Sequence, residues 1–210
     1  MKLEISKLDL QHLVEKQIDN LFLIHHHERN IISRCLDSVL ERCEYCFKHT
    51  QNKYYSQKNL TYFNPFHSGQ YSIFLYFLSS EIFHLGEETR TLADRIYYLN
   101  KCMNGLDLLY EVNMPRIFFL DHPVGSVIGR ATFGDYFAFS QNCTVGNNKG
   151  EFPVIGDGVS MQSGAKIVGK CKVGDNVIIS ANSYVKDVDI PSNSIVFGSS
   201  PNLILKKNKF

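Results

Sequence analysis

In the second half of the chain, bulky apolar residues recur every six positions. The series is Phe133, Phe139, Val145, then Ile155, Met161, Ile167, Val173, Ile179 and Val185. Four positions after most of them stands a smaller or apolar residue: Phe137, Cys143, Val159, Ala165, Cys171, Val177 and Ser183. A period of six fits neither a helix nor a strand, and a fixed repeat outweighs local propensity. The pattern predicts a three-sided parallel β-helix whose bulky residues point inward.

The six-residue step extends toward the N-terminus and is interrupted twice. Leu106, Val112, Phe118 and Val124 keep the step, and the register slips between positions 124 and 133. Ten residues separate Val145 from Ile155 where six would suffice, so about four residues around the segment NNKGE (147–151) are expected to be extruded. Because scaffolds carry function on such loops, the pattern places a site near this one.

The first half of the chain has helical periodicity instead. Apolar positions predict a helix over 8–24, a second that Asn30 caps and that continues through Phe47, a buried helix that begins at Ser68, and another from about Glu88 to Asn100. A polar segment, 48–59, separates the first pair from the second. The sequence therefore predicts an α+β protein: a helical domain over 1–104, then a β-helix domain over 105–210 with the capping tail PNLILKKNKF.

Composition narrows the class of protein. The formal net charge of +1 gives no electrostatic reason to expect nucleic acid as a partner. Six cysteines in 210 residues do not suggest a disulfide framework. The N-terminus lacks the apolar core of a signal peptide, and the most apolar run, 70–85, is too short to form a transmembrane segment. These features predict a soluble, cytoplasmic protein.

Two clusters invite a metal-site interpretation. Cys43 and Cys46 form a CEYC motif, and His25, His26 and His27 are consecutive. Both cysteines fall on the apolar stripe of a predicted helix, and consecutive residues of a helix fan out by about 100° each and cannot converge on one ion. We therefore expect no metal.

Three segments carry a resemblance to a known family. They are GLDLLYEVNMPRIFFLDH (105–122), SQNCTVGN (140–147) and ANSYVKDVDIPSNSIVFGSSP (181–201). They are similar to the first coils, the segment before the active-site loop and the final coil of the serine acetyltransferases. More broadly, the chain resembles the acyltransferases built on a left-handed β-helix of hexapeptide repeats. The resemblance implies direct transfer of an acetyl group from acetyl-CoA to an acceptor, without an acyl-enzyme.

The resemblance also implies the catalytic pair. His122 matches the family's general base, and Asp107 matches the aspartate that orients it. The two lie fifteen residues apart, close to one eighteen-residue coil, so they are expected near one corner of adjacent coils. An imidazole titrates near neutrality and can take the proton of a hydroxyl as it attacks a thioester. Two alternatives stay open: His122 as an ordinary turn residue, and Cys143 as an acyl carrier, although its inward position favours a buried structural thiol.

Departures from the family indicate the acceptor. The family holds the serine amine with two aspartates, of which Asp121 is kept and Asn64 replaces the other. Its arginine-histidine pair, which holds the serine carboxylate, is replaced by Glu151 and Phe152. A glutamate repels a carboxylate, so the sequence predicts a sugar hydroxyl of a surface polysaccharide or its precursor as the acceptor. The tail ends in Phe210 rather than in the family's sulfhydrylase-docking isoleucine. The alternatives are a serine O-acetyltransferase and a non-catalytic scaffold.

For the acetyl-CoA cosubstrate, the resemblance implies a site along the outside of the coils, between neighbouring subunits. Ser163, Ser180 and Ala181 match the family's small residues there, Gly146 and Asn147 are further candidates, and Lys186, Lys206 or Lys207 is expected to meet the nucleotide phosphates. The backbone amides of Gly146 and Asn147 are also expected to stabilise the oxyanion. The assembly implied is a homotrimer or a dimer of trimers.

Overall fold

A computed structural model describes residues 1–50, 52–57 and 60–209. Parts of the predicted polar segment and the terminal Phe210 lie outside this range. The chain divides into two compact units, Met1–Asn104 and Gly105–Phe210. Each unit is described by itself below.

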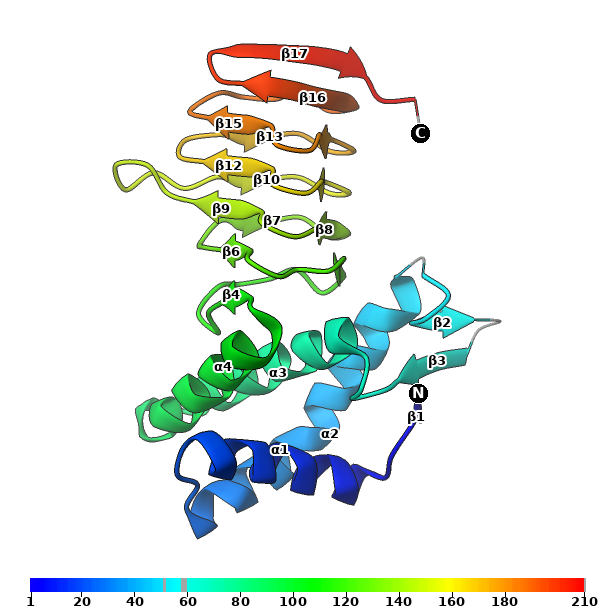
Figure 1. The fold of residues 1–210 in the computed structure, drawn as a ribbon, viewed down its shortest axis with the longest axis vertical. Coiled ribbons are helices and arrows are strands. Elements are labelled where there is room, and N and C mark those ends of the chain that lie inside the picture. The colour runs from blue at the N-terminus through cyan, green and yellow to red at the C-terminus, as the bar shows by residue number, and fades with distance from the viewer. Residues whose placement is uncertain (51, 58–59, 210) are drawn as a thin grey trace. The chain divides into compact units, whose positions relative to one another are not determined.

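The first unit is built on helices that pack around α3 (Ser68–Phe83) (Figure 1). The others are α1 (Lys7–Leu21), α2 (His26–His49), the short 3₁₀ helix η1 (Glu87–Thr89) and α4 (Arg90–Asn104). α3 contacts both α2 and α4 and is buried on nearly all sides, which explains why its apolar residues surround the helix rather than form one stripe. In the described part of the chain, no helix is both long and apolar enough to cross a membrane.

The predicted helices are confirmed, but the predicted cap at Asn30 is wrong. α2 begins at His26, and its N-cap is His25, five residues before Asn30. The backbone N–H of His25 donates to Glu28 Oε2 over 2.8 Å, which satisfies this end of the helix before Asn30 is reached. The apolar pattern also missed a small sheet, because its strands are short: β1 (Lys2–Leu3), β2 (Ser56–Gln57) and β3 (Leu60–Phe63).

The second unit is the predicted three-sided β-helix (Figure 1). The first face holds β4 (Asp107–Leu108), β6 (Val127–Ile128), β9 (Thr144–Gly146), β12 (Lys166–Val168) and β15 (Tyr184–Lys186). The second holds β5 (Phe118–Leu120), β8 (Phe137–Phe139), β11 (Ser160–Met161), β14 (Ile178–Ile179) and β16 (Ser194–Ser199). The third holds β7 (Thr132–Phe133), β10 (Val154–Ile155) and β13 (Lys172–Val173). These strands pair in parallel, and β17 (Asn202–Lys207) pairs antiparallel with β16 at the end of the stack.

Most of the six-residue register is confirmed. Val145, Ile167 and Val185 stack in one inward column, and each is no more than 1% exposed. Before position 128, the predicted inward residues Leu106, Val112 and Phe118 are buried, but the prediction for Val124 is wrong, because its side chain is 62% exposed. In the paired strands, the inward positions are instead Leu120, which faces Phe139, and Ile128, which faces Val145. The slip occurs at the corner between β5 and β6, earlier than the pattern placed it.

Close stacking of the coils depends on Gly134, at a corner next to the third face. A Cβ at this position would lie 2.5 Å from the backbone nitrogen of Asp157 in the next coil. Gly134→Ala is therefore expected to lower the free energy of unfolding by about 1–3 kcal/mol, because backbone must shift to admit the methyl group. Gly146→Ala is the matched control, since a Cβ there meets nothing within 4 Å. Urea unfolding followed by circular dichroism would measure both, and equal stabilities would contradict the close-packing argument.

Candidate active site

One corner of the β-helix, between the second and first faces, is turned by a column of residues with left-handed backbone. The column is Gly105, Gly125, Asn142, Gly164 and Asn182, with φ between 58° and 77°. Glycine and asparagine adopt this conformation at the lowest steric cost. Backbone hydrogen bonds join the coils along it, as where Gly125 N donates to Gly105 O over 2.8 Å. Each coil therefore repeats nearly the same turn here.

The turn that contains His122 is two residues longer than the others at this corner. Four residues join the second face to the first at 140–143, 162–165 and 180–183, whereas six, 121–126, join β5 to β6. The Ser126 hydroxyl closes this turn onto the next coil, donating to Ser140 O over 2.8 Å and accepting from Cys143 N over 3.0 Å. The extra residues bulge outward, which is why the six-residue pattern fails at this corner.

His122 stands on this bulge with its side chain in solvent. Its φ is 52°, an unusual value for a residue with a Cβ, and its side chain is 89% exposed. Pro123 is buried behind it, and Val124 N donates to His122 O over 2.8 Å. The backbone thus fixes where the side chain begins, while the imidazole ring is accessible to solvent. Strained backbone of this kind concentrates at functional sites.

A carboxylate lies beside the imidazole. His122 Nε2 is 3.7 Å from Asp121 Oδ1, and the Asp121 side chain is 56% exposed. Asp107, which the resemblance pairs with His122, is half-buried in β4 and faces Val127 of β6 in register. Its backbone N–H donates to Ser126 O over 2.9 Å, at the far end of the bulge. The orienting role of Asp107 stays a prediction, whereas Asp121 contacts the imidazole directly.

The predicted extruded loop is a tight β-hairpin at the corner between the first and third faces. Asn148 and Glu151 exchange backbone hydrogen bonds of 3.1 and 3.0 Å, and the two residues between them, Lys149 and Gly150, have φ of 52° and 83°. Positive φ at both positions is the signature of a type I′ turn. Asn148 Nδ2 donates to Asp187 Oδ2 over 2.6 Å, which ties the hairpin to a neighbouring coil.

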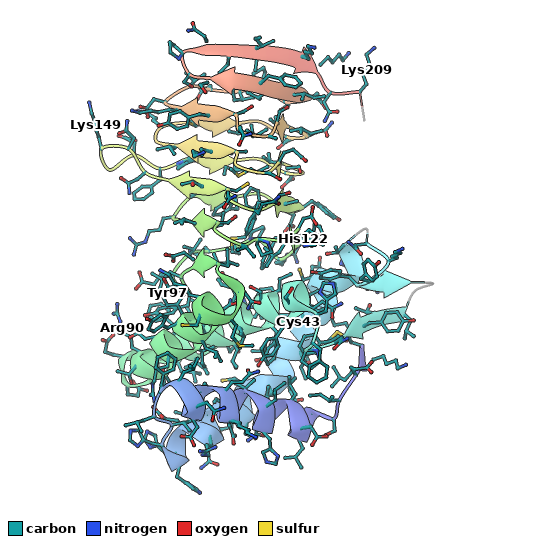
Figure 2. The ribbon with its side chains drawn as sticks, viewed as in Figure 1. Cys43, Arg90, Tyr97, His122, Lys149 and Lys209 are labelled. Atoms are coloured by element: carbon teal, nitrogen blue, oxygen red, sulfur yellow. The ribbon has the colours of Figure 1, made fainter. Side chains whose placement is uncertain are left out.

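The predicted acceptor residues fall into three places. Asp121 lies with His122, whereas Glu151 and Phe152 are exposed at the hairpin, and Figure 2 shows His122 and Lys149 of the hairpin on different sides of the β-helix. Asn64 belongs to the first unit, where its Oδ1 accepts from Phe66 N over 2.8 Å and its N–H donates to Gln70 Oε1 over 2.7 Å. Asn64 therefore has a structural role in the turn before α3.

The predicted cosubstrate residues lie at both ends of the first face. Ser163, Ser180 and Ala181 belong to the turns at the His122 corner. Gly146 and Lys186 each stand level with Val168 at the other end, and Asn147 follows Gly146 into the hairpin. The first face therefore connects both groups, and His122 stands at one of its edges.

Two alternative chemistries find no support in the described residues. Burial raises the pKa of Cys143, outweighing backbone hydrogen bonds and the charge of Lys166, and its Sγ lies 3.2 Å from Gln162 O, so the thiol is a structural group. Cys43 and Cys46 are fully buried in α2. No group of three or more histidine, cysteine or acidic residues in the described chain is arranged to hold a metal ion.

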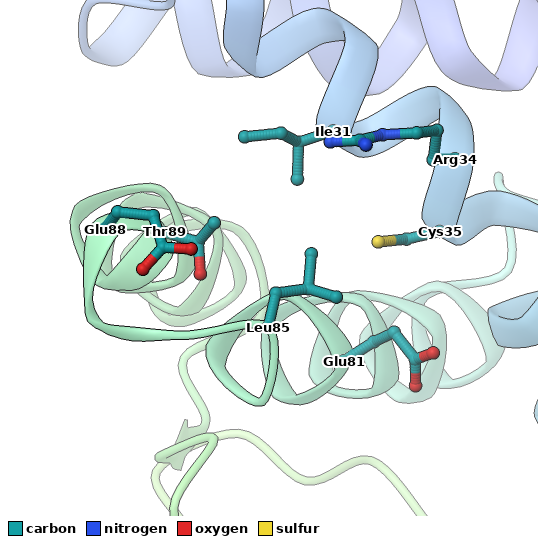
Figure 3. Close-up of a pocket in the computed structure, with 7 residues that line it drawn as sticks. All are labelled: Ile31, Arg34, Cys35, Glu81, Leu85, Glu88 and Thr89. Carbon is teal, nitrogen blue, oxygen red and sulfur yellow. The ribbon is translucent and has the colours of Figure 1, made fainter.

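The first unit contains a cavity of about 460 Å³ between α2, α3 and η1 (Figure 3). Arg34, Cys35, Glu81 and Leu85 are among its lining residues. Glu81 is already satisfied by Ser38, whose hydroxyl donates over 2.7 Å, and by Arg42 at 3.2 Å. The lining includes none of the residues predicted for the site, so this cavity does not replace the corner of His122 as the candidate site.

Comparisons of the sequence and of the fold with known proteins both find serine acetyltransferases. Residues 152–187 match the family model "Bacterial transferase hexapeptide (six repeats)". A serine acetyltransferase of Staphylococcus aureus is 29% identical over 147 residues, which cover 68% of this chain and 67% of that protein. The serine acetyltransferase of Neisseria gonorrhoeae has a similar fold, with a TM-score of 0.72 at 22% identity over 95% of this chain and 80% of that one. A serine acetyltransferase from Brucella abortus in complex with coenzyme A superposes with a TM-score of 0.68 at 20% identity, covering 97% of this chain and 83% of that one.

These comparisons overturn the sugar prediction. The relatives and the neighbouring structures are serine acetyltransferases, and one neighbour is a complex with cysteine. The prediction rested on two residues of the loop, Glu151 and Phe152, whereas the similarity extends over most of the chain. The resemblance of the sequence to the serine acetyltransferases agrees with these findings. They are the match to the hexapeptide model, the relatives and the three-sided β-helix. The chain is similar to serine acetyltransferases in both sequence and fold, and part of its β-helix matches the hexapeptide-repeat transferase model.

Proposed function

We propose that this protein is an L-serine O-acetyltransferase that uses acetyl-CoA. The observation that carries the proposal is the similarity to serine acetyltransferases in both sequence and fold, with the fold similarity extending over 95% of the chain. His122 adds the chemistry, because it presents an accessible imidazole on a fixed bulge next to a carboxylate. A general base in this position suits a reaction that activates a hydroxyl.

In the proposed mechanism, His122 takes the proton of the serine hydroxyl as the oxygen attacks the thioester carbonyl. The C–S bond then breaks, and the imidazolium returns its proton to the departing thiolate, so the enzyme ends in its starting state. Asp121, whose Oδ1 lies 3.7 Å from His122 Nε2, offers an anion to the serine ammonium group. Asp107 is proposed to orient the ring from the adjacent coil.

The cosubstrate is proposed to lie along the first face. Ser163, Ser180 and Ala181 are small, which lets an extended chain approach the backbone of the turns at the His122 corner. At the other end of the face, the N–H groups of Gly146 and Asn147 and the ammonium of Lys186 offer donors to carbonyl or phosphate oxygens. We further propose a homotrimer, so that a neighbouring copy closes the exposed corner of His122.

The test is acetyl transfer by the purified protein, measured as CoA release with L-serine and with a panel of sugars and oligosaccharides. We expect L-serine to be acetylated on its hydroxyl and the sugars to remain unmodified. Absence of transfer to L-serine, with acetyl-CoA bound, would contradict the proposal. Absence of both transfer and CoA binding would instead identify a non-catalytic scaffold.

A further inference from the structure

The proposed function requires a cation that the hairpin does not supply at residues 151 and 152. L-Serine carries a carboxylate, and the exposed side chains there are those of Glu151 and Phe152. We infer that Arg130 binds the carboxylate of the acceptor, in a site where His122 comes from a second copy of the chain. This inference rests on the proposed function and assigns its specificity-determining residue.

Arg130 lies at the same corner as the hairpin, one coil away. Val127 and Ile128 of β6 face Thr144 and Val145 of β9, and Gly129 N donates to Val145 O over 2.8 Å. Continuing this register sets Arg130 level with Asn147, the residue that leads into the hairpin. The side chain of Arg130 is 61% exposed, so it is accessible to a ligand at this corner.

The guanidinium of Arg130 is held in place from one side. Its Nη2 donates to Glu111 Oε2 over 2.5 Å, and the Glu111 side chain is only 22% exposed. A guanidinium has five N–H donors in a planar fork, so this bond leaves enough of them to bind a carboxylate through two parallel hydrogen bonds. The anchored fork loses less conformational entropy on binding than a mobile side chain would.

Other cations of this unit fit the role less well. Lys149 occupies the tip of the type I′ turn, where a long exposed side chain offers a mobile point charge. Arg116 lies 3.7 Å from Asp135, near the corner where Tyr136 N donates to Ile117 O. Lys166 folds back so that its Nζ donates to Gly164 O over 2.9 Å. Arg130 is the cation at the hairpin corner that combines a planar fork with a fixed position.

Arg130 and His122 lie too far apart in one chain to hold the same serine, so the inference requires two copies of the proposed homotrimer to share the site. Gly125 and Arg130 mark opposite ends of the first face in one coil, and five extended residues span about 17 Å. The hydroxyl and carboxylate of serine lie within about 4 Å of each other. Between the two ends, the face presents exposed side chains such as that of Val127. A second copy packed against this corner would bring its Arg130 toward the His122 of the first copy. The Arg130 of the first copy stays at the other end of the face.

The decisive comparison uses L-serine and L-serinamide, which keeps the ammonium and the hydroxyl but has no carboxylate. Arg130→Met is expected to raise the KM for L-serine about 100-fold and to leave kcat/KM for L-serinamide within about twofold. The preference of the wild type for serine over serinamide should thus disappear. Arg130→Lys should recover part of it. Lys149→Met, a cation lost at the same corner, should retain the full preference. An Arg130→Met protein that still prefers serine overturns the inference.

Failure of this inference is distinguishable from failure of the proposed function. Calorimetric binding of L-serine reports on Arg130 without any turnover. If the wild type binds L-serine without acetylating it, and Arg130→Met does not bind it, the proposed function fails and the carboxylate assignment holds. If the wild type neither binds nor acetylates L-serine, both fail.

The two-copy arrangement has a separate readout. Co-expression of His122→Ala and Arg130→Met chains should give mixed assemblies in which some sites combine an intact His122 with an intact Arg130. Random mixing in a cyclic assembly forms such sites in about one case in four, so about a quarter of the wild-type activity should return when L-serine is kept well below the raised KM of Arg130→Met. Activity no higher than that of the separate variants would overturn the assignment of Arg130 to a second copy.

Discussion

Replacing His122 by alanine is expected to lower kcat for acetyl transfer by about 10³-fold, within the range that a general base contributes. The reason is that the hydroxyl of the acceptor then has no group to accept its proton as it attacks the thioester. The imidazole is 89% exposed, so its loss removes little packing. Steady-state kinetics with saturating acetyl-CoA and L-serine would measure the effect, and unchanged unfolding would show that the fold is intact.

The left-handed backbone of His122 calls for a second variant. Alanine is strained at a φ of 52°, whereas asparagine adopts this conformation readily. His122→Asn should therefore keep the bulge and lose the same activity as His122→Ala. His12→Ala, which removes an exposed histidine of the first unit, is the control and should keep full activity. A His122→Asn protein with wild-type kcat would show that another residue is the base.

Replacing Arg95 by methionine is expected to destabilise the helical unit by about 3–5 kcal/mol. Arg95 donates to the carboxylate of Glu28 and to the carbonyl of Leu23, and the Glu28 side chain is only 6% exposed. Removing the guanidinium leaves a buried carboxylate without its cation, which costs more than the ion pair itself contributes. Urea unfolding at neutral pH, followed by the helical circular-dichroism signal, would measure the loss.

The same pair makes stability depend on pH. Burial raises the pKa of Glu28, but hydrogen bonds from Arg95 and from the backbone of His25 outweigh it, so the pKa lies below its ordinary value of 4.5. The contribution of the pair is therefore complete above pH 4.5 and is lost as the pH falls through the folded-state pKa. Arg95→Met removes the hydrogen bond and the charge of Arg95 but keeps the burial of Glu28 and its bond from His25, so the difference in stability between the two proteins should shrink on acidification.

An exposed ion pair provides the control for Arg95. Lys7 Nζ lies 2.8 Å from Asp37 Oδ1, with side chains 49% and 73% exposed. Lys7→Met should cost less than about 1 kcal/mol, because water already screens both charges. Equal losses in the two variants would mean that burial of Glu28 is not what makes the Arg95 pair important.

The β-helix could be predicted because its period has a single physical origin. Each coil points side chains inward at the same positions. Residues such as Ile167 and Val185 therefore recur at a fixed interval along the chain and stack on one another in space. The hairpin was predictable for the same reason, since four residues in excess must leave the coil. The bulge at residues 121–126 was misplaced, because Val124 continues the apolar step by coincidence and yet is exposed.

The acceptor could not be predicted from single positions. The pair Glu151–Phe152 argued against a carboxylate, but that argument assumed that charge must come from the same two positions of the loop. Arg130 is twenty-one residues earlier in the chain and reaches the same corner only through the register of β6 with β9. Such proximity has no local pattern in the sequence, so it becomes visible only in the folded chain.

The antiparallel strand β17 limits how molecules of this protein associate. Parallel coils expose an open edge that can in principle accept another copy, giving a fibre that grows end on end. By reversing direction over β16, the terminal strand presents a different hydrogen-bonding pattern, and it carries the exposed Lys206 and Lys207. The reversed strand offers no parallel edge to the first coil of another copy, and the two lysines repel a second such end, so polymerisation along the prism axis is disfavoured.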